Sequence, residues 1–575
     1  MKKNYLQKVL AVGMIGAMAA GTLSACGNSG SGDASSTPAS TASTTESKAE
    51  ASSQAATSEE ATESGATGID SWEAFADNVT LRVPVYDRGA EGVPDVTNNY
   101  WTNWVQENFG DKYNITVEYV PITRSDVMTD YALLASSNTL PTILMEYDYP
   151  KTSQWANDGY LTTFDMDEFA KVAPTYYQRM VDENQLDYSV MNGETYFALG
   201  SRPFYNILFK WQTFVRMDWL KEVGYDHVPT TREEYLDAMQ KIMDAGICEH
   251  PGGGTKLSGA GQDLNHSFRT IPQDEEEWAM YGDYNIVALG SEANKLLVKD
   301  ANEDYNLGIT NPEYYITDAE TAKANFVNGK QYSYAMYIHQ SADILKSLWE
   351  NDPDAELAIV PANACYGVNP AWRSDNPFGM IVGFSSTATE DEIKAAWMYM
   401  EWLSQEDNLF TFQWGIEGEN YTLNEEGLPV SVTGYEGEYK QGYSYNADYY
   451  CIVSASRNAG TIEQMIASDV PQGLKQSEEL TQEVIDYYYD RVELAKQGMA
   501  LVDCMFGTVI ESEGEYRDTL VSLYVELRDQ LTMCKPDEFE AKYEEATKTY
   551  NDAGYAEITA ERLQALKDGK TTRLK

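Results

Sequence analysis

The amino-acid sequence predicts a mixed α/β fold of two lobes, each a mainly parallel sheet flanked by helices, with a helical C-terminal extension. Three observations lead to this prediction. Strand-like and helix-like segments alternate through the first half of the chain, which is typical of βαβ units. About 500 residues follow a polar N-terminal segment, and one hydrophobic core rarely extends beyond roughly 250–300 residues. From Gln482 the pattern is helical almost to the end.

The N-terminal third supplies the clearest elements. Period-two alternation and short apolar runs predict strands at 80–85, 115–120 and 140–145. Helical periodicity between and after these strands predicts helices at 98–109, 125–136 and 154–159. Asn192 and Gly193 are typical of a hairpin turn between two short strands.

The middle of the chain repeats this alternation. The Thr231–Glu234 segment has the pattern of a capping box, which predicts a helix that runs to about Ala245. Apolar segments predict strands at 206–216, 332–338 and 378–384. Helical patterns predict helices at 217–223, 321–328 and 389–403.

The C-terminal helices carry two apolar stripes. The stripes are Leu520, Leu523, Leu527 and Leu531, then Phe539, Tyr543, Ala546 and Tyr550. Residues three and four apart lie on one helix face, so each stripe can bury against a neighbour. We interpret both stripes as core packing, with Gly554 as a helix stop.

Residues 1–25 have the features of a signal peptide. Lys2, Lys3 and Lys8 precede an apolar run at 9–21, and small residues follow. The Leu23–Cys26 tetrapeptide resembles the lipobox of bacterial lipoproteins, which implies cleavage before Cys26 and a lipid on its thiol. An ordinary secretory signal with a chance cysteine is the alternative. We expect the mature protein to be located at the extracellular face of the cell membrane and to be anchored there by the lipid.

Residues 26–76 are expected to form a lipidated cysteine and a disordered linker. From Gly27 to Gly68 the chain is mostly Ser, Thr, Ala, Gly and Glu, with no aromatic or large aliphatic residue. Such a segment cannot bury a core. A flexible chain of some 40 residues spans about 35 Å, which suits a tether.

Composition excludes several functions. The formal net charge is −50, so nucleic-acid binding and recruitment to an anionic bilayer by basic residues are not expected. Besides Cys26 the five cysteines are scattered without a CxxC pair, and none of the four histidines has metal-pair spacing. We therefore expect no metal, no cofactor and no disulfide scaffold.

Five stretches together resemble the type 1 extracellular solute-binding proteins, the receptors of ABC importers, and among them the larger carbohydrate-receptor lipoproteins. Each stretch is weakly specific alone, and their order along the chain is what resembles the family. The stretches are the lipobox with its linker, Leu140–Ile143, Phe214–Tyr235, Phe326–Lys330 and Trp414–Tyr421.

The resemblance implies a periplasmic-binding-protein-like fold whose two lobes are joined by hinge strands. Lobe 1 would comprise 77–203 and 378–432, and lobe 2 would comprise 204–377 and 433–575. It also implies a monomeric receptor that binds a carbohydrate, expected to be an oligosaccharide, without turnover and delivers it to ABC permease subunits.

The chain departs from the family where larger relatives carry a calcium loop. Glu249–Gly254 stands at that position instead. The alternation Asp300, Asn302, Asp304 and Asn306 imitates the start of a calcium loop, but it lacks the glycine and glutamate that follow. The segment 254–304 aligns with nothing in the family.

Candidate ligand-binding residues follow from the rule that open α/β sheets bind ligands at the carboxyl ends of their strands. Sugars pack on aromatic rings and hydrogen-bond to charged groups. The candidates are Asp87, Arg88, Tyr147, Asp148, Tyr149, Arg202, Tyr205, His339, Gln340, Trp372, Arg373, Trp414 and Glu417.

Each candidate has a structural explanation as well. The aromatic residues could pack in the core, the aspartates could cap turns, the arginines could bridge the lobes, and His339 could be purely structural. Two other functions also stay open: a lipid-anchored glycan-active enzyme, because carboxylates are abundant, and a binding or sensory lipoprotein that is not coupled to transport.

Overall fold

The computed structural model describes residues 67–89, 94–207, 211–256, 274–281, 286–338, 341–364, 372–425, 427–432, 446–457, 461–470 and 478–572. The expected signal peptide, Cys26 and most of the expected linker lie outside these ranges. Among the described helices, none combines the length and apolar character that a membrane span requires.

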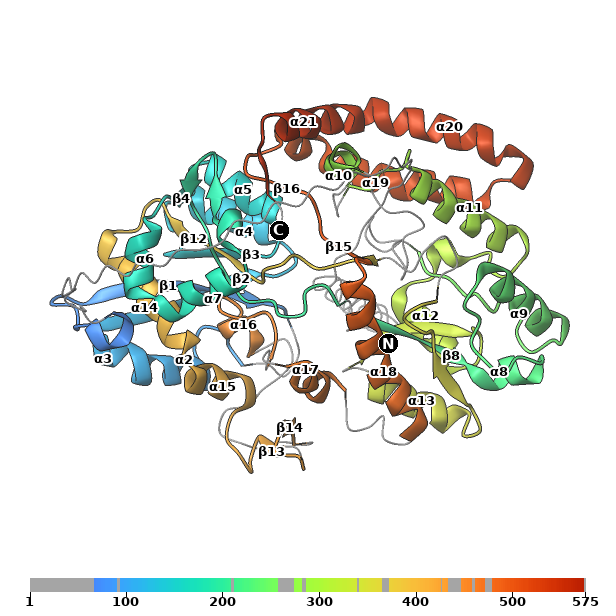
Figure 1. Cartoon of the computed structure of the whole chain (residues 1–575), viewed down its shortest axis with the longest axis horizontal. Helices are drawn as coiled ribbons and strands as arrows, with labels where there is room; N and C mark the ends of the chain where they lie inside the picture. The colour runs from blue at the N-terminus through green and yellow to red at the C-terminus, as the bar shows by residue number, and fades with distance from the viewer. Residues whose placement is uncertain are drawn as a thin grey trace, which may run out of the picture.

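The chain folds into two α/β bodies that stand side by side, with a group of long helices along one edge (Figure 1). The mixed α/β class and the helical C-terminal region agree with the sequence prediction. The buried apolar residues of the first body come from 79–199, 378–412 and 449–453, with Met505 added from the C-terminal part of the chain. Those of the second body lie between 207 and 362 and between 465 and 488.

The first body contains a parallel pair of strands and a mixed neighbourhood around them. β1 (Val79–Asp87) and β2 (Ile115–Thr123) pair in parallel, from Val79 beside Ile115 to Asp87 beside Thr123. β12 (Ile381–Ser385) pairs antiparallel with three short strands. These are β3 (Ile143–Glu146), β4 (Leu161–Thr162) and β7 (Ala198–Leu199).

Strand direction therefore differs from the expected mainly parallel sheets. β12 begins beside the end of β3, because Ile381 pairs with both Glu146 and Leu199. A strand that enters at the edge where others end must run antiparallel to them. β12 follows the long excursion through the second body, and this return was not visible in the local pattern.

Helices cover the first sheet. α14 (Glu390–Ser404) contacts β1 and α7 (Pro174–Asp182), and its buried Glu401 accepts hydrogen bonds from the first N–H groups of α7. The remaining helices of this body are α2 (Tyr100–Val105), α4 (Val127–Ser136), α5 (Tyr149–Asn157), α6 (Met166–Val172), α15 (Glu406–Trp414) and α16 (Ala447–Tyr450).

The second body is built on a three-stranded antiparallel sheet. β8 (Trp211–Arg216) lies between β9 (Ser333–Tyr337) and β10 (Leu357–Ile359). Its helices are α8 (Met217–Glu222), α9 (Arg232–Asp244), α12 (Ala319–Val327), α13 (Ser341–Asn351), α17 (Ile462–Asp469) and α18 (Glu478–Lys496). Figure 1 places α18 between the two bodies.

Three chain segments cross between the bodies next to one another. The Gly200 N–H donates a hydrogen bond to the Met380 carbonyl oxygen at 2.7 Å, and the Gly379 N–H donates to the Gly200 carbonyl oxygen at 2.8 Å. The third segment joins the first at Ser201. The Ser201 N–H donates to the Val453 carbonyl oxygen at 2.8 Å, and the Ser201 carbonyl oxygen accepts from the Ala455 N–H at 2.9 Å. A Cβ on Gly379 would lie 2.7 Å from the Ser201 carbonyl oxygen, so only glycine allows this approach.

The C-terminal helices form a third cluster that touches both bodies. α19 (Glu511–Met533), α20 (Phe539–Tyr550) and α21 (Ala556–Lys567) pack with α10 (Glu275–Tyr281) and α11 (Glu292–Asn306). The two predicted apolar stripes face this cluster. Gly554 makes a kink at φ +122° before α21, where a Cβ would lie 2.3 Å from the Tyr516 ring.

The structure adds detail to two segments discussed in the sequence analysis. Residues 449–453, which were assigned to lobe 2, pack in the core of the first body. The calcium-like alternation from Asp300 lies inside α11, where Asn302 donates hydrogen bonds to the Leu531, Thr532 and Cys534 oxygens and Asp304 pairs with Arg232. Both residues therefore hold helices together.

Candidate functional site

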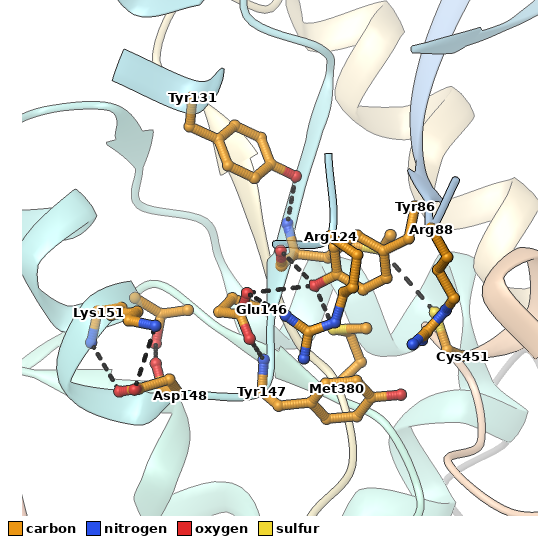
Figure 2. Close-up of polar contacts among 12 residues, drawn as sticks. Tyr86, Arg88, Arg124, Tyr131, Glu146, Tyr147, Asp148, Lys151, Met380 and Cys451 are labelled. Carbon is orange, nitrogen blue, oxygen red and sulfur yellow. Dashed lines mark hydrogen bonds and ion pairs between the residues drawn. The ribbon is translucent and has the colours of Figure 1, made fainter. Parts of the chain in front are cut away.

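The carboxyl ends of the first-body strands gather a group of charged and aromatic side chains. β1 and β2 end in register, and the residues that follow are Arg88 and Arg124. β3 ends at Glu146, and Tyr147 and Asp148 follow it. Figure 2 shows these side chains close together. The crossing segments lie at the same edge, because β12 begins and β7 ends there.

Glu146 occupies the centre of this group and is 2% exposed. Its carboxylate lies 3.6 Å from Arg124 Nη1 and accepts a hydrogen bond from the Tyr147 backbone N–H at 2.8 Å. The Tyr86 hydroxyl lies 3.4 Å from the same carboxylate, and the Arg124 guanidinium lies 4.8 Å from the centre of the Tyr86 ring. Burial, followed by the charge on Glu146, raises the pKa of Tyr86.

Arg88 joins β1 to α16, which precedes the third crossing segment. Its Nε and Nη2 atoms bond the two Asp448 oxygens at 2.7 and 2.9 Å, which is the bidentate geometry that arginine and carboxylate favour. Burial raises the pKa of Asp448, and the hydrogen bonds and charge of Arg88 act in the opposite direction. The Arg88 guanidinium also lies 5.9 Å from the centre of the Tyr86 ring.

Arg202 connects Tyr147 to the second crossing segment. Its guanidinium lies 5.4 Å from the centre of the Tyr147 ring, and Nη1 lies 3.4 Å from an Asp375 oxygen. The Asp375 backbone N–H donates to the Tyr205 carbonyl oxygen at 2.9 Å, so Tyr205 belongs to the same junction. Burial raises the pKa of the Tyr205 hydroxyl.

Asp148 links β3 to the C-terminal helices. Its Oδ1 atom accepts from the Lys151 N–H at 3.2 Å and so caps α5, and its Oδ2 atom lies 3.0 Å from Arg517 Nη2 on α19. Burial alone would raise the pKa of Asp148, but Arg517 and Lys151 outweigh burial and lower it. The carboxylate is therefore ionised at neutral pH.

The lowered pKa of Asp148 predicts a pH-dependent contribution to stability. A carboxyl group with a depressed folded-state pKa stabilises the fold above its unfolded value, near 3.9, and loses this contribution as the pH falls through the folded value. Asp148→Asn keeps a residue that caps helices. We expect the wild type to exceed the variant by about 1 kcal/mol at neutral pH. The difference in urea unfolding should shrink as the pH falls below about 4, and a pH-independent difference would contradict the assignment.

The remaining predicted residues lie apart from this group or cannot be placed. Tyr149 is 2% exposed and packs between the rings of Tyr188, Phe197 and Phe378. Asp87 is exposed and accepts from the Gly89 N–H at 2.9 Å. His339, Gln340 and the Arg373 side chain lie outside the described residues.

The two predicted tryptophans are covered by arginines. Trp414 is 1% exposed, and the Arg457 guanidinium lies 4.4 Å from the centre of its ring. Trp372 is equally buried, with the Arg491 guanidinium at 4.1 Å. Glu417 is exposed, in the segment before the small hairpin of β13 (Tyr421–Leu423) and β14 (Pro429–Ser431).

Six residues of the group were not predicted: Tyr86, Arg124, Glu146, Asp375, Asp448 and Arg517. Arg124 directly follows β2, so the strand-end rule that selected Arg88 applies to it equally. Asp375, Asp448 and Arg517 have no local signal, because each reaches the group from a part of the chain that is distant in sequence.

The four ion pairs Arg88–Asp448, Arg124–Glu146, Arg202–Asp375 and Arg517–Asp148 are called the paired-charge cluster below. Together with Tyr86 and Tyr147 they offer N–H donors, carboxylate acceptors and ring faces within one small region. Such a set matches a ligand that carries many hydroxyl groups and apolar C–H faces. In the described ranges, no group of three or more His, Cys, Asp or Glu side chains has the geometry of a metal site.

Comparisons with known proteins agree with this architecture. The chain is similar to an extracellular solute-binding protein from Bifidobacterium longum subsp. infantis, with 14% identity, a TM-score of 0.58, and coverage of 86% of this chain and 99% of that one. The N-glycan transport solute binding protein NgtS from Streptococcus pneumoniae is 12% identical, with a TM-score of 0.53 and coverage of 86% of this chain and 100% of that one. The S. pneumoniae substrate binding protein FusA in complex with kestose is 13% identical, with a TM-score of 0.54 and coverage of 85% of this chain and 99% of that one.

At these identities the similarity concerns the fold. No curated protein matches the chain in sequence. The family described as bacterial extracellular solute-binding protein matches residues 104–414, which is more than half of the chain. The chain therefore belongs to the bacterial extracellular solute-binding protein family.

Proposed function

We propose that this protein is a lipid-anchored receptor of an ABC importer, which binds an oligosaccharide at the paired-charge cluster and hands it on unchanged. Membership of the family supports the receptor role, and the sugars named for NgtS and FusA support the ligand class. The observation that carries the proposal is the position of the cluster, at the strand ends of one body and beside the three crossing segments.

The geometry supports binding in two ways. Tyr147 is partly exposed and lies beside Arg202, so its ring can receive a sugar face while the guanidinium bonds hydroxyls. Asp375 and Tyr205 belong to segments that cross between the bodies. The contacts of a ligand bound there would therefore change when the two bodies move relative to each other. We propose that the first body closes on the second body as the response to ligand.

A panel of oligosaccharides tested by thermal shift with the full chain would examine this function. A ligand present at about 1,000 times its Kd stabilises the folded state by about 4 kcal/mol, which corresponds to a clear rise in Tm. The glycan recovered afterwards should be intact. A shift with peptides or metal ions alone would refute the carbohydrate assignment, and a cleaved glycan would favour the enzyme alternative.

Tyr147→Ala is expected to weaken oligosaccharide binding about tenfold, because loss of an aromatic face costs on the order of 1 kcal/mol beyond the lost contact area. Isothermal titration calorimetry with the best glycan of the panel would measure it. Tyr147→Phe keeps the ring and should retain most of the affinity. Equal losses in both variants would show that the hydroxyl, rather than the ring, contributes to binding.

Cys26→Ala is expected to remove the lipid anchor. Cells supplied with radiolabelled palmitate should label the wild-type chain and not the variant, and the variant should leave the membrane fraction. Cys248→Ala alters a buried cysteine of the second body and serves as the control. A variant at Cys26 that still incorporates label would contradict the lipoprotein assignment.

A further inference from the structure

We propose that the paired-charge cluster selects uncharged oligosaccharides over oligosaccharides that carry carboxylate, sulfate or phosphate groups. This inference rests on the proposed receptor function and specifies its ligand class. It follows from the charge balance of the cluster, in which each arginine lies against its own carboxylate.

Each of the four pairs lies within ion-pair distance. The shortest nitrogen–oxygen separations are 2.7 Å for Arg88–Asp448, 3.0 Å for Arg517–Asp148, 3.4 Å for Arg202–Asp375 and 3.6 Å for Arg124–Glu146. All eight side chains are buried or largely buried. Each guanidinium charge is therefore already compensated in surroundings where water screens little.

An anionic ligand meets this balance unfavourably. To pair with one of the arginines, its charged group must displace a protein carboxylate or lie beside it. Two like charges within about 4–6 Å oppose each other strongly away from bulk water. A hydroxyl group has no such conflict, because it carries no charge and can both accept from a guanidinium N–H and donate to a carboxylate oxygen.

Charges at the margin do not change this balance. Lys151 lies 3.6 Å from Asp148 and is more exposed than the cluster, and the exposed Asp87 adds one negative charge at the end of β1. Arg491, on the neighbouring α18, is 2% exposed and lies against the rings of Trp372 and Tyr487. Its guanidinium therefore presents almost no surface to a ligand.

The charge of the whole chain acts in the same direction. A formal net charge of −50 surrounds the protein with a negative potential. Such a potential slows the association of anions and leaves neutral solutes unaffected. Local pairing and the long-range field are independent reasons for the same preference.

Matched glycan pairs test the selectivity with the full chain. The pairs are mannotriose and trimannuronate, galactotriose and trigalacturonate, xylotetraose and its glucuronosyl derivative, and N-acetyllactosamine and its 3′-sialyl derivative. Calorimetry at physiological ionic strength should show at least one neutral member binding at least about tenfold more tightly than its acidic counterpart. Acidic members that bind as tightly or more tightly overturn the inference and leave the receptor function standing. If no glycan binds, the proposed function fails and this inference fails with it.

A charge-neutralising variant separates the effect of the cluster on selectivity from the effect of the overall charge. Asp375→Asn keeps the size of the side chain but leaves Arg202 without the negative charge at 3.4 Å. We expect the ratio of acidic to neutral affinity to rise at least about fivefold. Asp237→Asn makes the same change in net charge on an exposed residue that pairs with Lys241 on α9 of the second body. An equal rise in both variants would show that the field of the whole chain, and not the cluster, sets the preference.

Discussion

Replacing Glu513 with alanine is expected to lower the free energy of unfolding by about 3–5 kcal/mol, because it removes one partner of a buried ion pair. Glu513 on α19 lies 2.6 Å from Arg562 Nε on α21, and Arg562 is 1% exposed. Arg562 Nη1 also donates to the Met280 carbonyl oxygen of α10 at 3.1 Å. The pair thus joins three helices of the C-terminal cluster, and urea unfolding monitored by circular dichroism would measure the loss.

An exposed ion pair of the same cluster supplies the control. Lys548 and Asp552 form a pair at the end of α20, and both side chains are mostly exposed. Exposed pairs contribute little, so Asp552→Ala should change stability by less than about 0.5 kcal/mol. Equal effects at Asp552 and Glu513 would contradict the role given to burial.

Replacing Asp448 with alanine is expected to weaken oligosaccharide binding on the order of 100-fold, that is by about 2.7 kcal/mol. Asp448 is 4% exposed and holds Arg88 in a bidentate pair, so its loss frees the guanidinium from its fixed position. It also leaves the arginine beside Tyr86 without the carboxylate that compensates its charge. Calorimetry with the best neutral glycan of the panel measures the change.

Two further variants distinguish positioning from general damage. Asp448→Asn keeps the shape of the side chain and should lose less affinity than Asp448→Ala. Arg88→Met combined with Asp448→Ala should cost less than the sum of the single losses, because the two residues act as a pair. Additive losses, or a wild-type affinity in Asp448→Ala, would refute the positioning role.

Much of the fold could be predicted from local patterns. The strands at 79–87 and 115–123 and the helices at 217–222, 232–244 and 390–404 lie within a few residues of the predicted ranges. These segments have clear periodicity and clear caps, and a local pattern is sufficient for them. Asn192 and Gly193 both take positive φ in the hairpin turn that their sequence favours.

Features that depend on distant parts of the chain could not be predicted. The antiparallel direction of β12 follows from where it re-enters the first body, and no residue within β12 encodes it. In the site, Arg88, Tyr147, Asp148, Arg202 and Tyr205 were selected because strand ends and loops are local features. Their ion-pair partners Asp448, Asp375 and Arg517 lie far away in the sequence, so no local pattern connects the two members of a pair.

Tyr149 shows the limit of selecting residues by type. An aromatic residue after a strand suits a sugar platform and a core position equally. In the structure the Tyr149 ring lies among three other aromatic rings, while its neighbour Tyr147 stays partly exposed. Adjacent residues at a strand end point in different directions, and sequence alone does not say which one faces outward.

The late position of β12 in the chain has a consequence for how the protein acquires its fold. The first body cannot complete its sheet until Ile381–Ser385 is available to pair with β3, β4 and β7. Contacts between such distant segments slow folding, because the chain must close a very long loop before it gains their stability. Until Ile381–Ser385 has been synthesised, β3, β4 and β7 lack the strand that joins them, so the sheet of the first body stays incomplete for most of the synthesis of this body.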